Sequence, residues 1–540
     1  MKKYFYLIGI LLVGTLLRFY HNLDISLWHD EAFSALLIKY PWQEMFYRIG
    51  LDVHPPAYYV FLRFWHYIFG DSLLALRSFS VFFGVGSIWA VWLLVKTAFN
   101  SHKAGIVSAV FLAVNLFQIQ YATEARMYTM GAFFTLLAGY FLVKALAYQT
   151  EEAKLHTLKM PNLPEVLALR KKTLWHYLGF TVSVIVMIYT HYYLLFASMA
   201  ICFYGLVYLF AHHRFTLKNY ILLLIAYFLI LASYLPWLKT FLYQYKQVGA
   251  GYWIPPMTGW SIPSTLYTLL VGFSHDISQS SVQKLLVLTS LVVLFVLYKF
   301  LRQTQSFHKW LVLLVALAPF GGSMLFLILA KLKGSESSVY LVRYFIFTGA
   351  FLSIIVAVWL SQFKIRWVFW LLATGYCLLN LFAFINYWQD INIRQRPGMK
   401  STAKYLQANF EPHHKLYSGS SFMFFNLKYY SNQFLKSDEP LVFGYGQLNI
   451  KPLLFSGGIT DVSSLPHYAG TAILENKDLL PDFNQNVKTG DVVWLVWTNG
   501  FGAQKPSIPK NWTEITEQAF PEVRPYLGTS VFVSEYKVSE

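Results

Sequence analysis

Charged residues are scarce in this chain of 540 residues: Asp, Glu, Lys and Arg together make up only 13%. Hydrophobic residues make up 56% and aromatic residues 19%, which is more apolar surface than a soluble protein of ordinary composition carries. The scarcity of charge excludes an ordinary soluble protein. The composition predicts a polytopic membrane protein.

Acidic residues are scarcer than basic ones, and the formal net charge is +17. Acidic and basic residues balance from residue 387 onward, so the excess lies earlier in the chain, in short loops between apolar runs. That distribution is typical of the positive-inside pattern of membrane proteins and argues against a nucleic-acid-binding groove. We therefore expect a lipid bilayer as a partner and no nucleic acid.

Cysteines are few, and metal-binding motifs are missing. Cys202 and Cys377 both lie inside apolar runs, so no disulfide framework is expected. The sequence has no HExxH or CxxC pattern, and neither His54 nor His191 has a second ligand at metal-binding spacing. No internal repeat of fixed period is visible, which weakens the interpretation as a transporter built from two similar halves.

About eleven apolar runs are long enough to cross the hydrocarbon core of a bilayer, which takes roughly 20 helical residues. The positive-inside rule assigns the basic loops and the N-terminus to the cytoplasm, and an odd number of spans puts the C-terminal part on the other side. The runs lie near residues 4–20, 73–95, 104–122, 127–147, 174–190, 192–211, 219–238, 284–300, 310–330, 344–360 and 367–386.

The composition changes near residue 387, where span-length apolar runs stop and polar residues, glycines and prolines separate short elements. A helix is predicted at 398–410 and strands at 491–497 and 529–533. We therefore expect two domains. Residues 1–386 form an all-α polytopic domain in the cell membrane, and residues 387–540 form a soluble α/β domain on the non-cytoplasmic face.

The loop between the first two predicted spans carries two adjacent acids, Asp30 and Glu31, in the string LWHDEAFS. The predicted topology places them at the outer surface of the membrane. The loop closes with HPPAYY, where two prolines predict the start of a helix with His54 at its entrance and Tyr58 on its apolar face. Adjacent carboxylates can bind a divalent cation, but the pair is a weak metal signal, so no metal or other cofactor is assigned.

Further polar groups are expected on the same outer face. Glu124 and Arg126 lie in the turn YATEARMY, His191 lies in YTHYYLL at the end of the fifth span, and Arg343 precedes a late span. Carboxylates and cations together suit the transfer of a sugar from a lipid phosphate. Such a reaction needs a base for the acceptor proton and a positive environment for the departing phosphate.

Simpler interpretations stay open for each of these groups. In these interpretations, Asp30 and Glu31 would cap a helix or pair with an arginine, and Glu124 and Arg126 would pair with each other or with lipid headgroups. His191 would have a packing role. For most of the outward-facing cations, reaching out to lipid headgroups is the simpler expectation. These cations include Arg18, Arg63, Arg77, Lys239 and Arg343.

Two long strings, LLRFYHNLDISLWHDEAFS and HPPAYYVFLRFWHYIFGDSLLALRSFSVFFG, resemble the N-terminal region of glycosyltransferase family 39. The turn YATEARMYTM, the THYY string and the later VRYF string are similar to it as well. This is the family of protein O-mannosyltransferases and bacterial lipid-carrier-dependent glycosyltransferases. The resemblance implies the GT-C fold and a polyprenyl-phosphate sugar donor used on the non-cytoplasmic face.

The resemblance also assigns roles by position. It implies Asp30 as the candidate base, with Glu31 beside it and Glu124 as the second acid. The substrate-binding candidates are His54, Tyr58, Arg126, His191 and Arg343, with Arg126 and Arg343 the first choices for the phosphate. The sequence leaves open which of Asp30 and Glu31 takes the proton.

The resemblance leaves the acceptor open. The chain lacks the extra outer MIR-type domain of eukaryotic protein O-mannosyltransferases and has fewer predicted spans than expected of aminoarabinose transferases. We therefore expect transfer to a protein, lipid or glycan acceptor. Two alternatives are a transporter or flippase of lipid-linked or small-molecule substrates, which predicts paired broken helices, and a non-catalytic relative.

Overall fold

The chain folds into two compact units in the computed structural model. The helical unit comprises Met1–Tyr20, His54–Tyr58 and Arg77–Ile385, and the mixed unit comprises His21–Val53, Tyr59–Leu76 and Asn386–Glu540. The loop that carries the paired acids thus belongs to the same compact unit as the C-terminal part. The domain boundary at residue 386 stays a prediction. The structure describes residues 2–155, 163–212, 217–250, 254–272, 279–332, 334, 338–391, 398–419, 421–431, 442–444, 471–474, 478–480, 482–500, 505–522 and 529–540.

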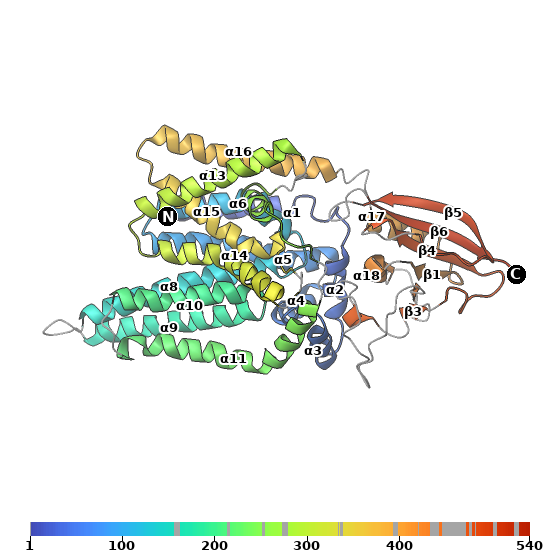
Figure 1. Ribbon diagram of the computed structural model, residues 1–540, viewed down its shortest axis with the longest axis horizontal. Helices are drawn as coiled ribbons and strands as arrows, with labels where there is room; N and C mark the ends of the chain where they lie inside the picture. Colours follow the sequence, from blue (N-terminus) through green and yellow to red (C-terminus); the bar gives the residue numbers. More distant parts are fainter. Residues whose placement is uncertain are drawn as a thin grey trace. The chain divides into compact units, whose positions relative to one another are not determined.

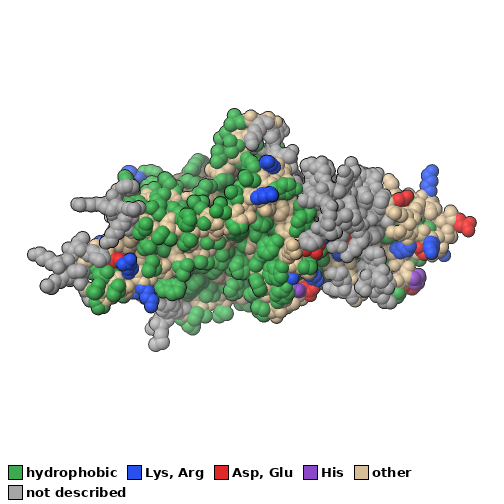
Figure 2. Space-filling view, turned by 90° about the horizontal axis from the view of Figure 1, so that it is seen from below, with side chains coloured by type: hydrophobic (Ala, Val, Ile, Leu, Met, Phe, Trp, Pro, Cys, Tyr) green, Lys and Arg blue, Asp and Glu red, His purple; other side chains and the backbone are tan. Residues whose placement is uncertain are grey.

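Long helices build most of the helical unit (Figure 1). Among the candidate spans of the described residues, Val342–Ser361 is the most enclosed, because 83% of its 18-residue apolar stretch is buried. In Ser280–Gln303 only 17% of the corresponding stretch is buried. Figure 2 shows apolar side chains over most of this unit's visible surface, as expected of helices that face lipid. The helices are α1 Lys2–Phe19, α5 Leu73–Ala98, α6 His102–Val114, α7 Leu116–Ala122, α8 Tyr128–Leu155, α9 Leu163–Ile188, α10 Tyr193–His212, α11 Leu217–Ala250, α12 Ser261–Val271, α13 Ser280–Gln303, α14 Lys309–Leu332, the 3-10 helix η1 Val342–Phe345, α15 Ile346–Ser361 and α16 Arg366–Ile391.

Eight of the described helices are long and apolar enough to cross a membrane, and a ninth span results if the bent pair α6 and α7 counts as one. Each of the predicted apolar runs coincides with a helix except the third, which covers the bent pair α6 and α7, so the all-α membrane part is confirmed. The predicted number of about eleven spans is higher because it also includes α1 and α9. The apolar part of α1, Phe5–Phe19, is one of the shorter helices, and α9 is outside the eight.

The third predicted span is broken at Asn115, where α6 and α7 meet at an angle of 59°. The side-chain oxygen of Asn115 accepts the backbone N–H of Gln118 and so caps the start of α7. The guanidinium of Arg18 donates to the carbonyls of Leu112 and Ala113 at the end of α6. A break among apolar helices leaves backbone groups without helical partners, and these side chains supply them.

Three of the arginines expected to reach lipid headgroups are buried instead. The exposed fraction is 0% for Arg18, 7% for Arg63 and 2% for Arg77. The Cζ atom of Arg63 lies 4.3 Å from the ring centroid of Trp42, and its Nε donates to the hydroxyl of Tyr67. The expectation is wrong for these three arginines, because protein carbonyls and aromatic rings bind the guanidinium of Arg18 and of Arg63.

The mixed unit combines short helices with one sheet of six described strands (Figure 1). The strand order is β3-β2-β1-β4-β6-β5, with parallel pairs from β3 to β4 and antiparallel pairs from β4 to β5. The predicted helix at 398–410 and strands at 491–497 and 529–533 correspond to α17, β4 and β6. The elements are α2 His29–Leu37, α3 Trp42–Leu51, α4 Ala57–Phe69, α17 Gly398–Asn409, β1 Lys415–Ser418, α18 Ser421–Ser431, β2 Val442–Gly444, the 3-10 helix η4 Thr471–Ile473, β3 Leu479–Leu480, β4 Val492–Thr498, β5 Trp512–Pro521 and β6 Ser530–Val538.

Strand β4 lies in the middle of this sheet and is almost entirely buried. Its run VVWLVWT is apolar on both faces, as expected of a strand covered on both sides. The ring of Trp497 stacks on that of Phe532 in β6 at 4.1 Å between centroids. Helix α18 packs against both the sheet and α2, so the C-terminal part supports the helix that carries the paired acids.

Candidate active site

Asp30 and Glu31 occupy the first turn of α2, in the mixed unit. Glu31 is 0% exposed, and its carboxylate accepts the backbone N–H of Trp28, immediately before the helix, at 3.4 Å. Asp30 is half-buried. Glu31 thus has the helix-starting role that the sequence left open for either acid, which favours Asp30 as the base.

Three of the other predicted residues gather around His191 in the helical unit. The rings of His54 and His191 have centroids 5.9 Å apart. Nη2 of Arg126 lies 3.4 Å from Nε2 of His54, and because a guanidinium only donates, this Nε2 accepts. Residues from three distant parts of the sequence therefore meet at one place.

Arg343 joins this group from η1, just ahead of α15. Its Cζ atom lies 6.0 Å from the ring centroids of Tyr128 and Tyr344. The ring of Tyr344 is 4.6 Å from that of His191, and the ring of Tyr128 is 6.2 Å from it. We call His54, Arg126, His191 and Arg343 the cation cluster; two tyrosine rings line it.

His191 is uncharged in this cluster. Its Nδ1 accepts the backbone N–H of Tyr193 at 3.2 Å, so the neutral ring carries its hydrogen on Nε2. Burial lowers the pKa of His191 well below its ordinary value, and electrostatic interactions with His54, Arg126 and Arg343 lower this pKa further. At neutral pH His191 is a hydrogen-bond donor beside two permanently charged arginines.

Backbone contacts hold the HPP segment beside His191. The N–H of Ala57, the first residue of α4, donates to the carbonyl of Tyr189 at 2.8 Å. Because Tyr189 is two residues before His191, this bond ties the chain next to His54 to the chain next to His191. Tyr58 is fully buried, and its ring lies 5.5 Å from that of Phe79, so its position is that of a core residue.

The Glu124 turn is fixed from α5. The hydroxyl of Ser80 donates to the carbonyl of Arg126 at 3.2 Å, and the hydroxyl of Thr129 donates to the carbonyl of Ser80 at 2.9 Å. Glu124 is half-buried, and its carbonyl accepts the N–H of Arg126 at 2.8 Å. The turn therefore presents Arg126 in a defined direction.

Three tyrosines near His191 were not selected as site residues from the sequence. Tyr128, Tyr193 and Tyr344 all lie within strings that were already singled out, YATEARMYTM, THYY and VRYF. The hydroxyl of Tyr193 donates to the carbonyl of Val339 at 2.7 Å. Repeated tyrosines beside each candidate cation were the available signal.

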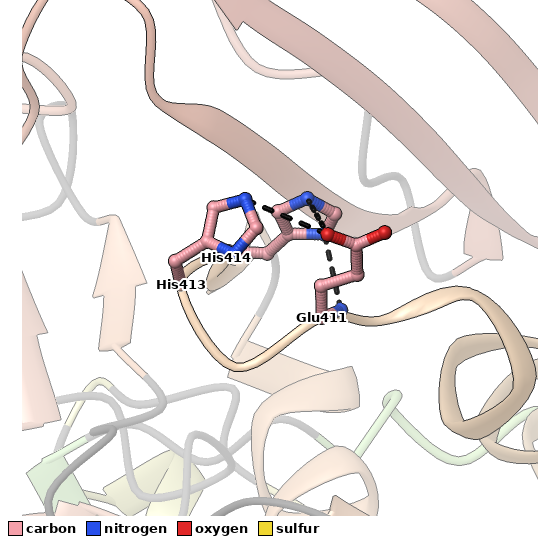
Figure 3. A group of neighbouring side chains, drawn as sticks. All are labelled: Glu411, His413 and His414. Atoms are coloured by element: carbon pink, nitrogen blue, oxygen red, sulfur yellow. Dashed lines mark hydrogen bonds and ion pairs between the residues drawn. The ribbon is translucent and has the colours of Figure 1, made fainter.

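A second group of ligand-type side chains lies between α17 and β1, in the mixed unit (Figure 3). Oε2 of Glu411 is 3.6 Å from Nε2 of His413 and 3.8 Å from Nε2 of His414. Nδ1 of His414 accepts N–H groups from Glu411, at 3.2 Å, and from the indole of Trp494, at 3.0 Å. The neutral ring therefore carries its hydrogen on Nε2, the atom a metal ion would need, so this arrangement does not suit a metal site.

Comparison with known proteins gives matches to a family and to solved structures. Residues 53–158 match the family described as dolichyl-phosphate-mannose-protein mannosyltransferase. The crystal structure of ArnT from Cupriavidus metallidurans in the apo state has 12% sequence identity and a TM-score of 0.59, covering 99% of this chain and 98% of that chain. The same protein bound to undecaprenyl phosphate has 13% identity and a TM-score of 0.58, covering 98% and 97%. A search of curated protein sequences gives no match.

The solved structures show that the chain has the GT-C fold of a polytopic membrane protein. At this level of identity the solved structures show the fold alone, and the family match covers 106 of the 540 residues. Over these residues the chain is similar to the mannosyltransferase family, in keeping with the resemblance to glycosyltransferase family 39 in the sequence. The comparisons give no support to the transporter alternative.

Proposed function

We propose that this protein transfers a sugar from a polyprenyl-phosphate donor to an acceptor on the non-cytoplasmic face of the membrane. The observation that carries the proposal is the cation cluster around His191. A structure of the same fold, ArnT from Cupriavidus metallidurans, is bound to undecaprenyl phosphate, which supports a donor of this chemistry.

The cation cluster suits a phosphate group. Arg126 and Arg343 both interact electrostatically with His191, so both guanidinium groups lie near this residue. Guanidinium groups bind phosphate oxygens with several donors at once and keep their charge in apolar surroundings. The uncharged Nε2–H of His191 adds a donor without competing for the negative charge.

The reaction is a substitution at the anomeric carbon. The acceptor hydroxyl forms a new C–O bond to the sugar, and the bond between the sugar and the phosphate oxygen breaks. The carboxylate of Asp30 takes the hydroxyl proton, and the polyprenyl phosphate leaves with the bonding electron pair. Arg126 and Arg343 stabilise the negative charge that develops on the departing phosphate.

The remaining assignments belong to the same proposal. Residues 387–540 are assigned to the non-cytoplasmic side of the cell membrane because of the distribution of basic loops in the sequence. The acceptor is a protein, a lipid or a glycan. Glu124 is the second candidate acid, on the same turn as Arg126.

A binding experiment tests the donor class. The purified protein in detergent is heated with polyprenyl phosphate, with the matching polyprenol that lacks the phosphate, or with neither. We expect the phosphate to raise Tm and the polyprenol to leave it nearly unchanged, because a ligand that binds only the folded state stabilises it. Equal shifts with both lipids would contradict a phosphate site. Lipid flux across vesicles without sugar transfer would favour the transporter.

A further inference from the structure

Helix α18 binds both backbone groups of Leu27, which lies three residues before Asp30. The N–H of Leu27 donates to the hydroxyl of Tyr430 at 2.9 Å, and Nδ2 of Asn426 donates to the carbonyl of Leu27 at 2.7 Å. Asn426 and Tyr430 are one helical turn apart and both are buried. The contact joins residues about 400 positions apart in the sequence, within one compact unit.

Further contacts fix the same short segment. The backbone N–H of Lys400, in α17, donates to the hydroxyl of Ser26 at 3.0 Å, and Nζ of Lys400 donates to the carbonyl of Leu23 at 2.8 Å. The ring of His29 lies 5.4 Å from that of Phe425 in α18. The segment before α2 is irregular in backbone conformation, so these long-range bonds rather than a helix or a strand decide where α2 begins.

Another hydrogen bond of α18 goes to a segment far from Asp30 in the sequence. The hydroxyl of Tyr429, the neighbour of Tyr430, donates to the carbonyl of Asp71 at 2.8 Å. Asp71 lies before α5, and 41 positions separate it from Asp30 in the sequence. The two tyrosines therefore make similar hydrogen bonds to two different segments of the same unit.

We propose that α18 of the C-terminal part is a positioning element for Asp30, acting through Asn426 and Tyr430 on the backbone of Leu27. The proposal rests on the proposed function, in which Asp30 takes the acceptor proton. A general base has to lie within hydrogen-bond reach of the proton it removes, and a misplacement of about 1 Å can lower the rate about 100-fold. The two bonds fix the peptide groups before and after Leu27 and so set the direction in which the first turn of α2 begins.

Three single variants and one double variant test the positioning role. Tyr430→Phe removes the acceptor for the Leu27 N–H, Asn426→Leu removes the donor at similar size, and the double variant removes both. Tyr429→Phe is the matched control, because it deletes the same hydroxyl one residue away. Each full-length variant is assayed for kcat, KM for the donor, Tm and hydrogen exchange of the Leu27 amide.

We expect the double variant to lower kcat about tenfold or more, with KM for the donor within about twofold, because the cation cluster is unchanged. Exchange at Leu27 should rise in Tyr430→Phe and stay slow in Tyr429→Phe. The control should keep kcat even where its Tm falls as far as that of Tyr430→Phe. A double variant with the kcat of the control would overturn the proposal, and so would a loss of kcat that follows Tm equally in both tyrosine variants.

The test separates this inference from the function on which it rests. If Asp30→Asn is inactive while the Asn426 and Tyr430 variants keep kcat, only the positioning role fails. If Asp30→Asn retains activity, the assignment of the base fails, whatever the α18 variants show. If Asn426→Leu does not fold, Tyr430→Phe still decides, because it keeps the buried ring and removes one oxygen atom.

Discussion

The two units place opposite charges in different ways. In the helical unit, Arg126 and Arg343 lie among aromatic rings and histidines contributed by the ends of long apolar helices. In the mixed unit, Asp30 lies at the start of a short helix, and hydrogen bonds from the C-terminal part fix the backbone before it. In the proposed function, the enclosed arginines hold the phosphate and the fixed backbone before Asp30 sets the direction of its carboxylate.

This comparison divides the expected kinetic effects. Substitutions in the cation cluster should weaken donor binding, since they remove charge that acts on the bound phosphate. Substitutions at Asp30 and its supports should lower kcat, since they act on proton transfer. A cation-cluster variant that lowers only kcat, or an Asp30 variant that weakens only donor binding, would contradict this division of roles.

The largest effect is expected at Asp30. Asp30→Asn removes the group that takes the proton and should lower kcat at least about 100-fold, the usual contribution of a general base. Glu31→Gln keeps an oxygen for the Trp28 N–H and should stay within about tenfold of the wild type. Steady-state kinetics with each variant measure both values. The opposite order would make Glu31 the base.

A smaller effect is expected at the arginines. Arg126→Met or Arg343→Met should weaken donor binding about 10- to 100-fold, because a hydrogen bond to a charged group contributes about 1.5–3 kcal/mol. The titration of each variant with polyprenyl phosphate gives Kd. Arg302→Met is the control, because Arg302 lies exposed at the end of α13 and should keep the Kd of the wild type. An unchanged Kd in both cluster variants would mean that the phosphate binds elsewhere.

The break between α6 and α7 tests the stability of the helical unit. Asn115→Ala removes the cap of α7 and the donor to the carbonyl of Leu269, and should cost about 1–2 kcal/mol. Ser108→Ala in α6 is the control, because the Ser108 hydroxyl bonds only a carbonyl of its own helix, that of Ala104. Thermal unfolding in detergent should separate the two variants. Equal Tm values would show that the cap adds nothing.

The smallest effect concerns pH. Because burial keeps the pKa of His191 below its ordinary value, the unfolded chain binds a proton below about pH 6.5 that the folded protein does not bind. Folding stability should therefore fall as the pH drops below about 6.5, by up to about 1.4 kcal/mol per pH unit from this group. Tm measured between about pH 5 and 8 should have a shallower slope in His191→Asn. An unchanged slope would contradict a neutral, buried His191.

Much of the helical unit could be predicted from the sequence, because apolar runs of span length form helices wherever they occur in a bilayer. The break at Asn115 was missed although a local signal exists: an asparagine inside an apolar run with a glutamine three residues later resembles a capping box. The burial of Arg18 could not be predicted, because the carbonyls of Leu112 and Ala113 that it binds on α6 lie more than 90 residues away in the sequence.

The residues of the candidate site could be chosen from the sequence, and their arrangement could not. His54, Arg126, His191 and Arg343 were singled out from the sequence, and the structure brings these four together. The sequence left open which of Asp30 and Glu31 takes the proton, because only the fold shows that Glu31 is enclosed and bonded to Trp28. The inclusion of the first loop in the same unit as the C-terminal part has no local signal, since it depends on contacts with α17 and α18.

Turnover of a donor is the direct test of sugar transfer by this protein. The purified protein is incubated with a panel of polyprenyl-phosphate sugars and candidate acceptors, and the release of polyprenyl phosphate is measured beside Asp30→Asn. We expect the wild type to release polyprenyl phosphate from at least one donor and Asp30→Asn to release almost none, while both bind the donor equally well. Folded wild-type protein that consumes no donor, or a variant as active as the wild type, would contradict it.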